Sequence, residues 1–253
     1  MTEVIDMDIA ADHAADDVQW RSDMTVELVK SSAQDSDVVW AARVSTVGEK
    51  SISARDEDAE RSAGLIRYLM RERHGTPFEH NSMTFLISAP IFVFREFHRH
   101  RVGWSYNEAS GRYSELDAVF YVPGPERRLV QEGKPGHYVF VEGSAEQHET
   151  VVTETKRACL ESYAAYQRML DAGLAREVAR GVLPVATYSS MYATCNARSL
   201  MAFLSLRTKR EDSTFPSYPQ REIEMVAEQM EAHWAQLMPI TYDAFNRAGR
   251  VSP

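Results

Sequence analysis

The sequence predicts an α+β fold: a single domain in which a central, largely antiparallel sheet is flanked by long helices. Segments with helical periodicity are mixed with separated, strand-like segments, and neither an internal repeat nor a linker divides the 253 residues. Hydrophobic residues make up 44% of the chain and charged residues 26%, which is typical of a globular protein with a sizeable core. We place the domain over residues 23–253. Residues 1–20 hold six acidic residues and no Lys or Arg, so we assign an acidic flexible tail to 1–22.

The first half of the domain mixes short strands with helices. Alternating apolar residues over 83–89 predict a strand, and Ile66, Leu69 and Met70 share one face of a helix that Gly75 ends. Pro90 is suited to the first position of the next helix. The expected elements are a strand over 24–30, a short helix over 36–44, a polar loop over 48–58, a helix over 58–74, a strand over 83–89 and a helix from 90 to about 99.

The second half is dominated by helices. Ser144 and Gln147 form the pattern of a capping box at the start of the longest helix, and Gly173 ends that helix. Asn196 is suited to cap a later helix. The expected elements are helices over 144–172 and 175–182, a strand over 186–194, a helix from 196 to about 207, a polar loop over 209–218 and a helix over 219–237.

Composition and charge exclude several classes of function. The net charge of −9 argues against a general nucleic-acid binder. No apolar run approaches the roughly 18 residues of a membrane helix, and the acidic N-terminus does not resemble a secretory signal. Two cysteines, Cys159 and Cys195, are too few for a disulfide scaffold. We therefore expect a cytoplasmic protein that binds neither a membrane nor macromolecular nucleic acid.

The segment 95–112 has the side chains of an anion-binding site. It holds four arginines and two histidines in eighteen residues, with small, hydroxyl and amide side chains between them. Like charges this close repel one another unless anions neutralise them. Backbone N–H groups of residues 109–111 can bind a phosphate in a turn, and Arg112 can add a bidentate contact. A solvated basic face is the plainer interpretation of the same residues.

This segment resembles the signature of the flavin-dependent thymidylate synthases, which is Arg-His-Arg, seven residues and Ser, commonly followed by Gly-Arg-Tyr. Here eight residues separate Arg99-His100-Arg101 from Ser110-Gly111, and we place the extra residue within 102–104. Further blocks at 74–80, 176–184 and 196–207 resemble the family in the same order.

The resemblance implies an enzyme that methylates dUMP to dTMP. It implies FAD as cofactor, with NADPH and 5,10-methylenetetrahydrofolate as co-substrates, and a homotetramer whose active sites are built at subunit interfaces. The twelve glycines form no GxGxxG motif, so a non-Rossmann flavin site is expected, as in this family.

Individual roles follow from the match to the family motifs. Arg207 resembles the arginine that orients the uracil ring, and His74 resembles a histidine near the flavin that is linked to folate use and electron transfer; both are candidate catalytic residues. The residues that resemble flavin contacts are Ser45, Thr76, Glu79, Arg99, His100, Arg101, Asn196, Arg198 and Leu206. The residues that resemble dUMP contacts are Glu96, Glu108, Ser110, Gly111, Arg112, Arg180 and Arg207.

Three features depart from the family pattern. Glu96 stands where a glutamine often helps to bind dUMP, and its carboxylate would repel a phosphate unless Arg95 or Arg99 neutralises it. Ala202 stands where an asparagine that contacts the flavin is common. The loop after Arg207 is longer than usual.

The residues alone leave other interpretations open. His74 and Asn196 could serve only to cap helices, and Arg198 and Arg207 could form surface ion pairs. A metal-dependent hydrolase is one rival class, although the nearby arginines would oppose a cation and no HExxH or CxxC motif is present. Its ligands would be His74, Glu79, His80, His98 and His100. An RNA-binding module that stacks bases on Trp104 and Tyr106 is the other rival, and the negative net charge argues against it.

Overall fold

The computed structural model describes residues 18–56, 59–134 and 137–253. The chain forms two compact units by packing. The first unit contains Ser110–Tyr188 and the described residues up to Asp23, and the second contains Met24–Ala109 and Ser189–Pro253. Helices and a largely antiparallel sheet are both present, so the predicted α+β class is confirmed. No helix in the described ranges is long and apolar enough to cross a membrane.

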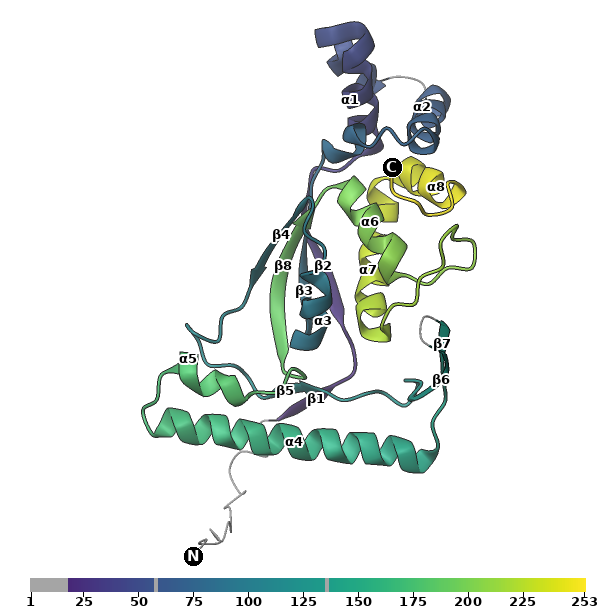
Figure 1. Cartoon of the computed structure of the whole chain (residues 1–253). Coiled ribbons are helices and arrows are strands. Elements are labelled where there is room, and N and C mark those ends of the chain that lie inside the picture. Colours follow the sequence, from purple (N-terminus) through teal and green to yellow (C-terminus); the bar gives the residue numbers. More distant parts are fainter. Residues whose placement is uncertain (1–17, 57–58, 135–136) are drawn as a thin grey trace, which may run out of the picture. The chain divides into compact units, whose positions relative to one another are not determined.

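A four-stranded sheet forms the centre of the second unit (Figure 1). Its strands lie in the order β2 (Thr25–Ser31), β3 (Met83–Pro90), β8 (Tyr188–Cys195) and β4 (Trp104–Glu108). β2 pairs antiparallel with β3, and β4 pairs antiparallel with β8. The strand predicted over 83–89 is confirmed, and its alternating side chains Met83, Phe85 and Ile87 are fully buried.

Helices cover this sheet and close one end of the second unit. They are α1 (Asp35–Val47), α2 (Ala59–Arg71), α3 (Ile91–Phe97), α6 (Ala197–Arg207), α7 (Arg221–Leu237) and α8 (Pro239–Arg247), with the 3₁₀ segments η1 (Gly48–Asp56) and η2 (Thr76–Glu79). α7 packs against β2, α3 and α6, and its Trp234 is fully buried. α1, α2 and α8 pack together, with Asp35 accepting hydrogen bonds from the N–H groups of Ile240 and Thr241 at the start of α8.

The first unit contains the longest helix and two strand pairs. β1 (Gln19–Arg21) pairs parallel with β5 (Val119–Tyr121), and β6 (Val130–Lys134) forms an antiparallel hairpin with β7 (His137–Val141). α4 (Ala145–Asp171) is followed by α5 (Arg176–Ala179) and the 3₁₀ turn η3 (Arg180–Val182). The predicted capping box of α4 is confirmed, and Gly173 ends the helix with φ 78°.

Several elements differ from the sequence prediction. The polar loop expected over 48–58 contains η1, α3 ends at Phe97 rather than near 99, and α8 and the strands β1, β4, β5, β6 and β7 were not predicted. Residues 19–21, which we assigned to a flexible tail, form the strand β1 instead. Trp20 of β1 packs on Phe120 of β5 with ring centroids 5.7 Å apart. Residues 1–17 of that tail lie outside the described residues. Gly75 does not end α2: Arg73 takes the left-handed conformation there with φ 60°.

Candidate active site

The Arg-His-Arg motif forms the turn between α3 and β4. Its side chains Arg99 and Arg101 are exposed, whereas His100 is half-buried. The Tyr106 hydroxyl fixes the turn, because it lies 3.0 Å from the Phe97 carbonyl oxygen and 2.8 Å from that of His100. The Arg-His-Arg backbone is therefore braced by a residue that the sequence analysis considered only as a stacking platform in the RNA-binding alternative.

The segment 102–104, where we place the extra residue of the signature, forms a turn that packs on α6. Gly103 has φ 69°, and a Cβ atom at this position would collide with the Ser199 hydroxyl. Ser199 Oγ donates a 3.0 Å hydrogen bond to the Val102 carbonyl. Trp104 then stacks on Tyr106, with ring planes 11° apart. Residues 102–104 therefore form a turn that requires glycine at position 103, and Trp104 is a packing residue.

Arg207 lies at the last turn of α6 and is held by two side chains from the α3 region. Its Nη1 is 2.5 Å from a Glu96 carboxylate oxygen, and its Nε donates a 3.0 Å hydrogen bond to His100 Nε2. Burial and the adjacent guanidinium lower the pKa of His100 to about 4, so the ring is neutral and can accept this hydrogen bond. Glu96 is thus paired with Arg207, a residue that the sequence did not suggest as its partner.

A second arginine, Arg198, connects the first turn of α6 with η2. Its Nη1 is 2.5 Å from Glu79 Oε1, and its Nε donates to the Pro253 carbonyl oxygen at 2.7 Å. A Cβ atom at Gly75 would overlap the Arg198 guanidinium carbon, so a side chain here would displace that group. Gly75, which we expected to end a helix, instead packs against Arg198.

The other predicted flavin contacts of the second unit differ in their surroundings. Asn196 caps α6, with its Oδ1 accepting from the Ser199 N–H at 2.9 Å. Ser45 is exposed on α1 and donates to the Ala42 carbonyl of its own helix. Two further predicted flavin contacts, Thr76 and Leu206, are exposed. His74, which we expected near the flavin, is also exposed and contacts the Tyr68 ring edge-on. Capping is therefore at least one role of Asn196.

Most predicted dUMP contacts belong to the first unit. Arg112 is exposed and pairs with Glu177, its Nε lying 2.8 Å from the carboxylate. The Arg112 N–H donates to Ser110 Oγ at 3.3 Å, and a Cβ atom on Gly111 would lie 3.3 Å from the Arg180 side chain. Ser110, Gly111, Arg112 and Arg180 are thus neighbours within this unit.

The second unit contributes Glu96, Glu108 and Arg207 to the same predicted set. Glu108 is the last residue of β4 and is half-buried. The N–H of Ala109, expected to face a phosphate, instead donates to the carbonyl of Ser190 in β8 at 2.8 Å. The Ala109 N–H is therefore unavailable to a phosphate, and the predicted phosphate-binding turn keeps the N–H groups of the residues after it.

The ligands of the rival metal site do not come together. Within the described part of the chain, no three His, Cys, Asp or Glu side chains form a group that could hold a metal ion. His98 contacts the Tyr106 ring, and His80 contacts the Trp40 ring. These two histidines pack against aromatic side chains.

Comparisons with known proteins cover almost the whole chain. A family model described as thymidylate synthase complementing protein matches residues 27–240. A flavin-dependent thymidylate synthase of Streptomyces avermitilis is 68% identical over 244 residues, which are 96% of this chain and 99% of the relative. Another from Thermotoga neapolitana is 41% identical over 224 residues, 87% of this chain and 89% of the relative. The crystal structure of a UMP/dUMP methylase from Streptomyces cacaoi bound with 5-Br dUMP superimposes with a TM-score of 0.88 at 61% identity, covering 93% of this chain and 100% of that one.

Proposed function

The chain belongs to the family of flavin-dependent thymidylate synthases, and we propose that it methylates dUMP to dTMP with FAD, NADPH and 5,10-methylenetetrahydrofolate. The observation that carries this proposal is the placement of Arg207. A permanently charged, planar group is held at the end of α6 between a carboxylate and a neutral imidazole. Such a group stabilises negative charge without a proton transfer.

The side chains present fit the proposed cofactor. Arg99 and Arg101 are exposed, and the Arg198 side chain is 42% exposed, so their guanidinium groups are available to the diphosphate of FAD. When bound, FAD supplies the redox chemistry that links NADPH to the methyl transfer. The task of the chain's own residues is to bind and orient.

We assign Arg207 to the uracil ring. Methylation at C5 builds negative charge on the ring and on its C4 oxygen, and a fixed guanidinium opposite that oxygen lowers the energy of this state. Glu96 and His100 prevent Arg207 from rotating freely, so little reorganisation is needed when the charge develops. Glu96 belongs to the proposed dUMP site through this contact. We place His74 near the flavin.

We assign the phosphate of dUMP to the second set of residues. Arg112 and Arg180 supply positive charge, Ser110 and Gly111 supply a hydroxyl and a backbone N–H, and Glu108 completes the set. Binding energy from the phosphate, remote from C5, then helps to position the base.

We further propose a homotetramer with active sites at subunit interfaces, a single functional domain over 23–253, and a cytoplasmic location. The last is supported by the thiols, since Cys159 and Cys195 are both free and buried.

A tritium-release assay tests the proposed reaction. Purified protein is incubated with C5-tritiated dUMP, NADPH and methylenetetrahydrofolate, with and without FAD. We expect release of tritium and formation of dTMP only when FAD is present, with activity restored on adding FAD to stripped protein. Undiminished turnover in rigorously flavin-free protein would contradict the proposal.

A further inference from the structure

Thr208, the residue directly after Arg207, is buried and fixed by three hydrogen bonds besides that of its own backbone N–H. Its hydroxyl donates to the Leu204 carbonyl at 2.7 Å and accepts from Arg250 Nη2 at 2.9 Å. Its carbonyl accepts from Ser217 Oγ at 2.6 Å. The backbone from which Arg207 extends therefore cannot shift without breaking buried hydrogen bonds.

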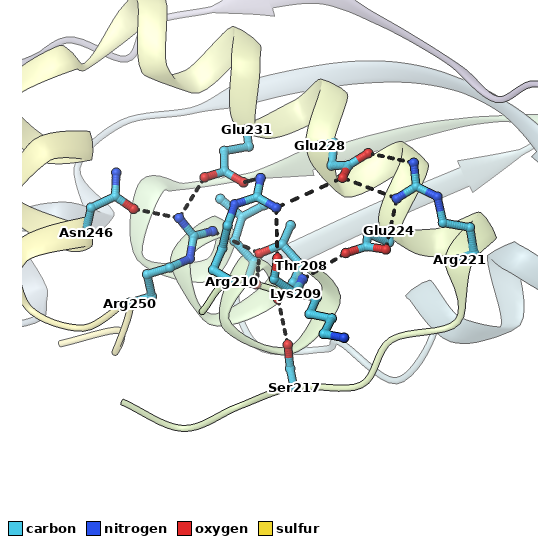
Figure 2. Close-up of polar contacts among 11 residues, drawn as sticks. Thr208, Lys209, Arg210, Ser217, Arg221, Glu224, Glu228, Glu231, Asn246 and Arg250 are labelled. Carbon is cyan, nitrogen blue, oxygen red and sulfur yellow. Dashed lines mark hydrogen bonds and ion pairs between the residues drawn. The ribbon is translucent and has the colours of Figure 1, made fainter. Parts of the chain in front are cut away.

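Arg250 is the side chain that connects Thr208 to the core of the second unit (Figure 2). Its side chain is 2% exposed, and Nη1 lies 2.7 Å from Glu231 Oε1 and 2.6 Å from Asn246 Oδ1. Glu231, 4% exposed, also accepts from Arg210 at 3.0 Å. A buried charge is tolerated only when it is paired and hydrogen-bonded, so these contacts are made together or lost together.

The backbone of Arg250 is also unusual. Its φ is 59°, a conformation that residues with a Cβ atom rarely adopt, and it follows Gly249 at φ 67°. The N–H groups of Gly249 and Arg250 bond back to the carbonyls of Asn246 and Phe245, so the two residues end α8 in a Schellman motif. This turn directs a non-glycine side chain into the interior, at a conformational cost that the polar contacts of the guanidinium offset.

The ion pairs continue outward to the surface, where they matter less. Arg221 is the outermost cation, with its side chain 44% exposed, and it pairs with Glu224 and Glu228. Exposed pairs of this kind contribute little to stability. Arg221 therefore provides a matched control: the same residue type and the same network, but no contact with Thr208.

We propose that Arg250 is a positioning residue for Arg207, acting through Thr208 and anchored by Glu231. Its importance for catalysis rests on the function proposed above for Arg207. The placement of Arg207 itself can be measured without any turnover, because His100 accepts a hydrogen bond from Arg207 Nε and senses its charge.

The first experiment is an NMR titration of labelled histidines in the full chain, between about pH 3 and pH 8. Three variants are compared. Arg250→Lys keeps the positive charge but loses the two-nitrogen guanidinium, and Thr208→Val keeps the shape of the side chain but loses its hydroxyl. Arg221→Gln is the control. We expect the titration midpoint of His100, about 4 in the parent, to rise by roughly one pH unit in the first two variants and to stay unchanged in Arg221→Gln. If Arg250→Lys does not fold, Thr208→Val decides the outcome. An unchanged His100 midpoint in folded Thr208→Val would overturn the proposal.

The second experiment separates positioning from catalysis. Turnover of dUMP is measured well below the unfolding temperature of each variant. We expect kcat to fall about tenfold or more in Arg250→Lys and Thr208→Val, while FAD content and the KM for dUMP stay within about twofold of the parent. A shifted His100 midpoint without any loss of kcat would uphold the positioning and contradict the role assigned to Arg207. Equal losses of kcat in Arg221→Gln would overturn the proposal.

Discussion

At the scale of single residues, the arginines of the candidate site carry charge that the chain partly neutralises. Arg112, Arg198 and Arg207 each pair with a carboxylate, and of the three Arg207 has the least exposed side chain, at 17%. Pairing in a partly buried setting fixes geometry, whereas the exposed pairs are readily exchanged for a ligand. We therefore expect Arg207 to be preorganised and Arg112 to change partner when phosphate binds.

Arg207→Ala tests this preorganised charge. We expect turnover to fall by about two orders of magnitude or more, because one fixed stabilising donor is lost, while flavin absorbance is retained. Steady-state kinetics and the visible spectrum check both points. Arg247→Ala, which removes an exposed arginine from an ion pair with Asp243 on α8, is the matched control and should behave like the parent. Loss of flavin with intact dUMP binding would show that the roles were exchanged.

The two cysteines are expected to be inert. Burial raises the pKa of both thiols, to about 11 for Cys159, so neither is a thiolate at neutral pH. A cysteine that attacks uracil C6 would need to be a thiolate. The double variant Cys159→Ala, Cys195→Ala should keep its turnover once folded, and mass spectrometry with 5-fluoro-dUMP should find no cysteine adduct. An adduct on Cys195, together with an inactive but folded Cys195→Ala protein, would contradict this mechanism.

His100 predicts a pH dependence of stability. Its pKa is about 4 in the folded chain and about 6.5 when unfolded, so the unfolded state binds more protons between these values. The folded state is therefore favoured when His100 is neutral. This contribution of His100 to the free energy of unfolding is complete above about pH 6.5 and is lost as the pH falls towards 4. Burial of the imidazole is the main cause of the lowered pKa, and the Arg207 guanidinium, which is itself paired with Glu96, adds to it.

Chemical unfolding at several pH values checks this. Other groups titrate in the same window, so the comparison is with His100→Gln, whose amide can still accept from Arg207. The variant should lose less stability than the parent on acidification. Parallel stability curves for the two proteins would show that His100 is not the group responsible.

At the scale of elements, α6 organises the proposed flavin and uracil contacts of the second unit. Asn196 caps its first turn, Arg198 lies in that turn, and Leu206 and Arg207 lie in its last turn. A rigid helix of eleven residues thus sets the distance between two ends of the candidate site.

Loss of the α6 cap should therefore affect function more than loss of a cap elsewhere. Asn196→Ala and Ser144→Ala each remove one N-cap side chain, and each should cost about 1 kcal/mol of stability. We expect only Asn196→Ala to lower flavin content, since Ser144 caps α4 and has no assigned contact. Thermal unfolding and flavin absorbance measure the two effects. Equal flavin loss in both variants would point to a general effect of destabilisation.

At the scale of the whole molecule, the proposed tetramer is the feature that a single chain does not contain. Most dUMP positions lie in one compact unit and the flavin positions in the other. Sedimentation equilibrium should give a mass four times the 28.7 kDa of the chain. Mixing Arg207→Ala and Arg112→Ala subunits should then restore part of the activity, since sites shared between subunits can recover one intact copy of each arginine. A monomeric, fully active protein would contradict the shared site.

Local sequence determined those parts of the protein that depend on short-range physics. The capping box of α4, the alternation of β3 and the Arg-His-Arg motif with its following turn all depend on residues close together in the chain, and the blocks of residues that resemble the family occur in the family's order. β4 was missed because its half-buried alternation is weak and its partner β8 lies about ninety residues away. β1 was missed because three residues carry too little pattern.

Only the tertiary structure decided which partners the charged residues take. Glu96 pairs with Arg207 rather than with its neighbours Arg95 or Arg99, and Gly75 packs against Arg198 from α6. The buried contact of Arg250 with Thr208 joins positions 42 residues apart. Sequence specifies the charge and reach of a side chain, whereas its partner depends on which backbone segments packing brings within about 3 Å, and that is a property of the whole fold.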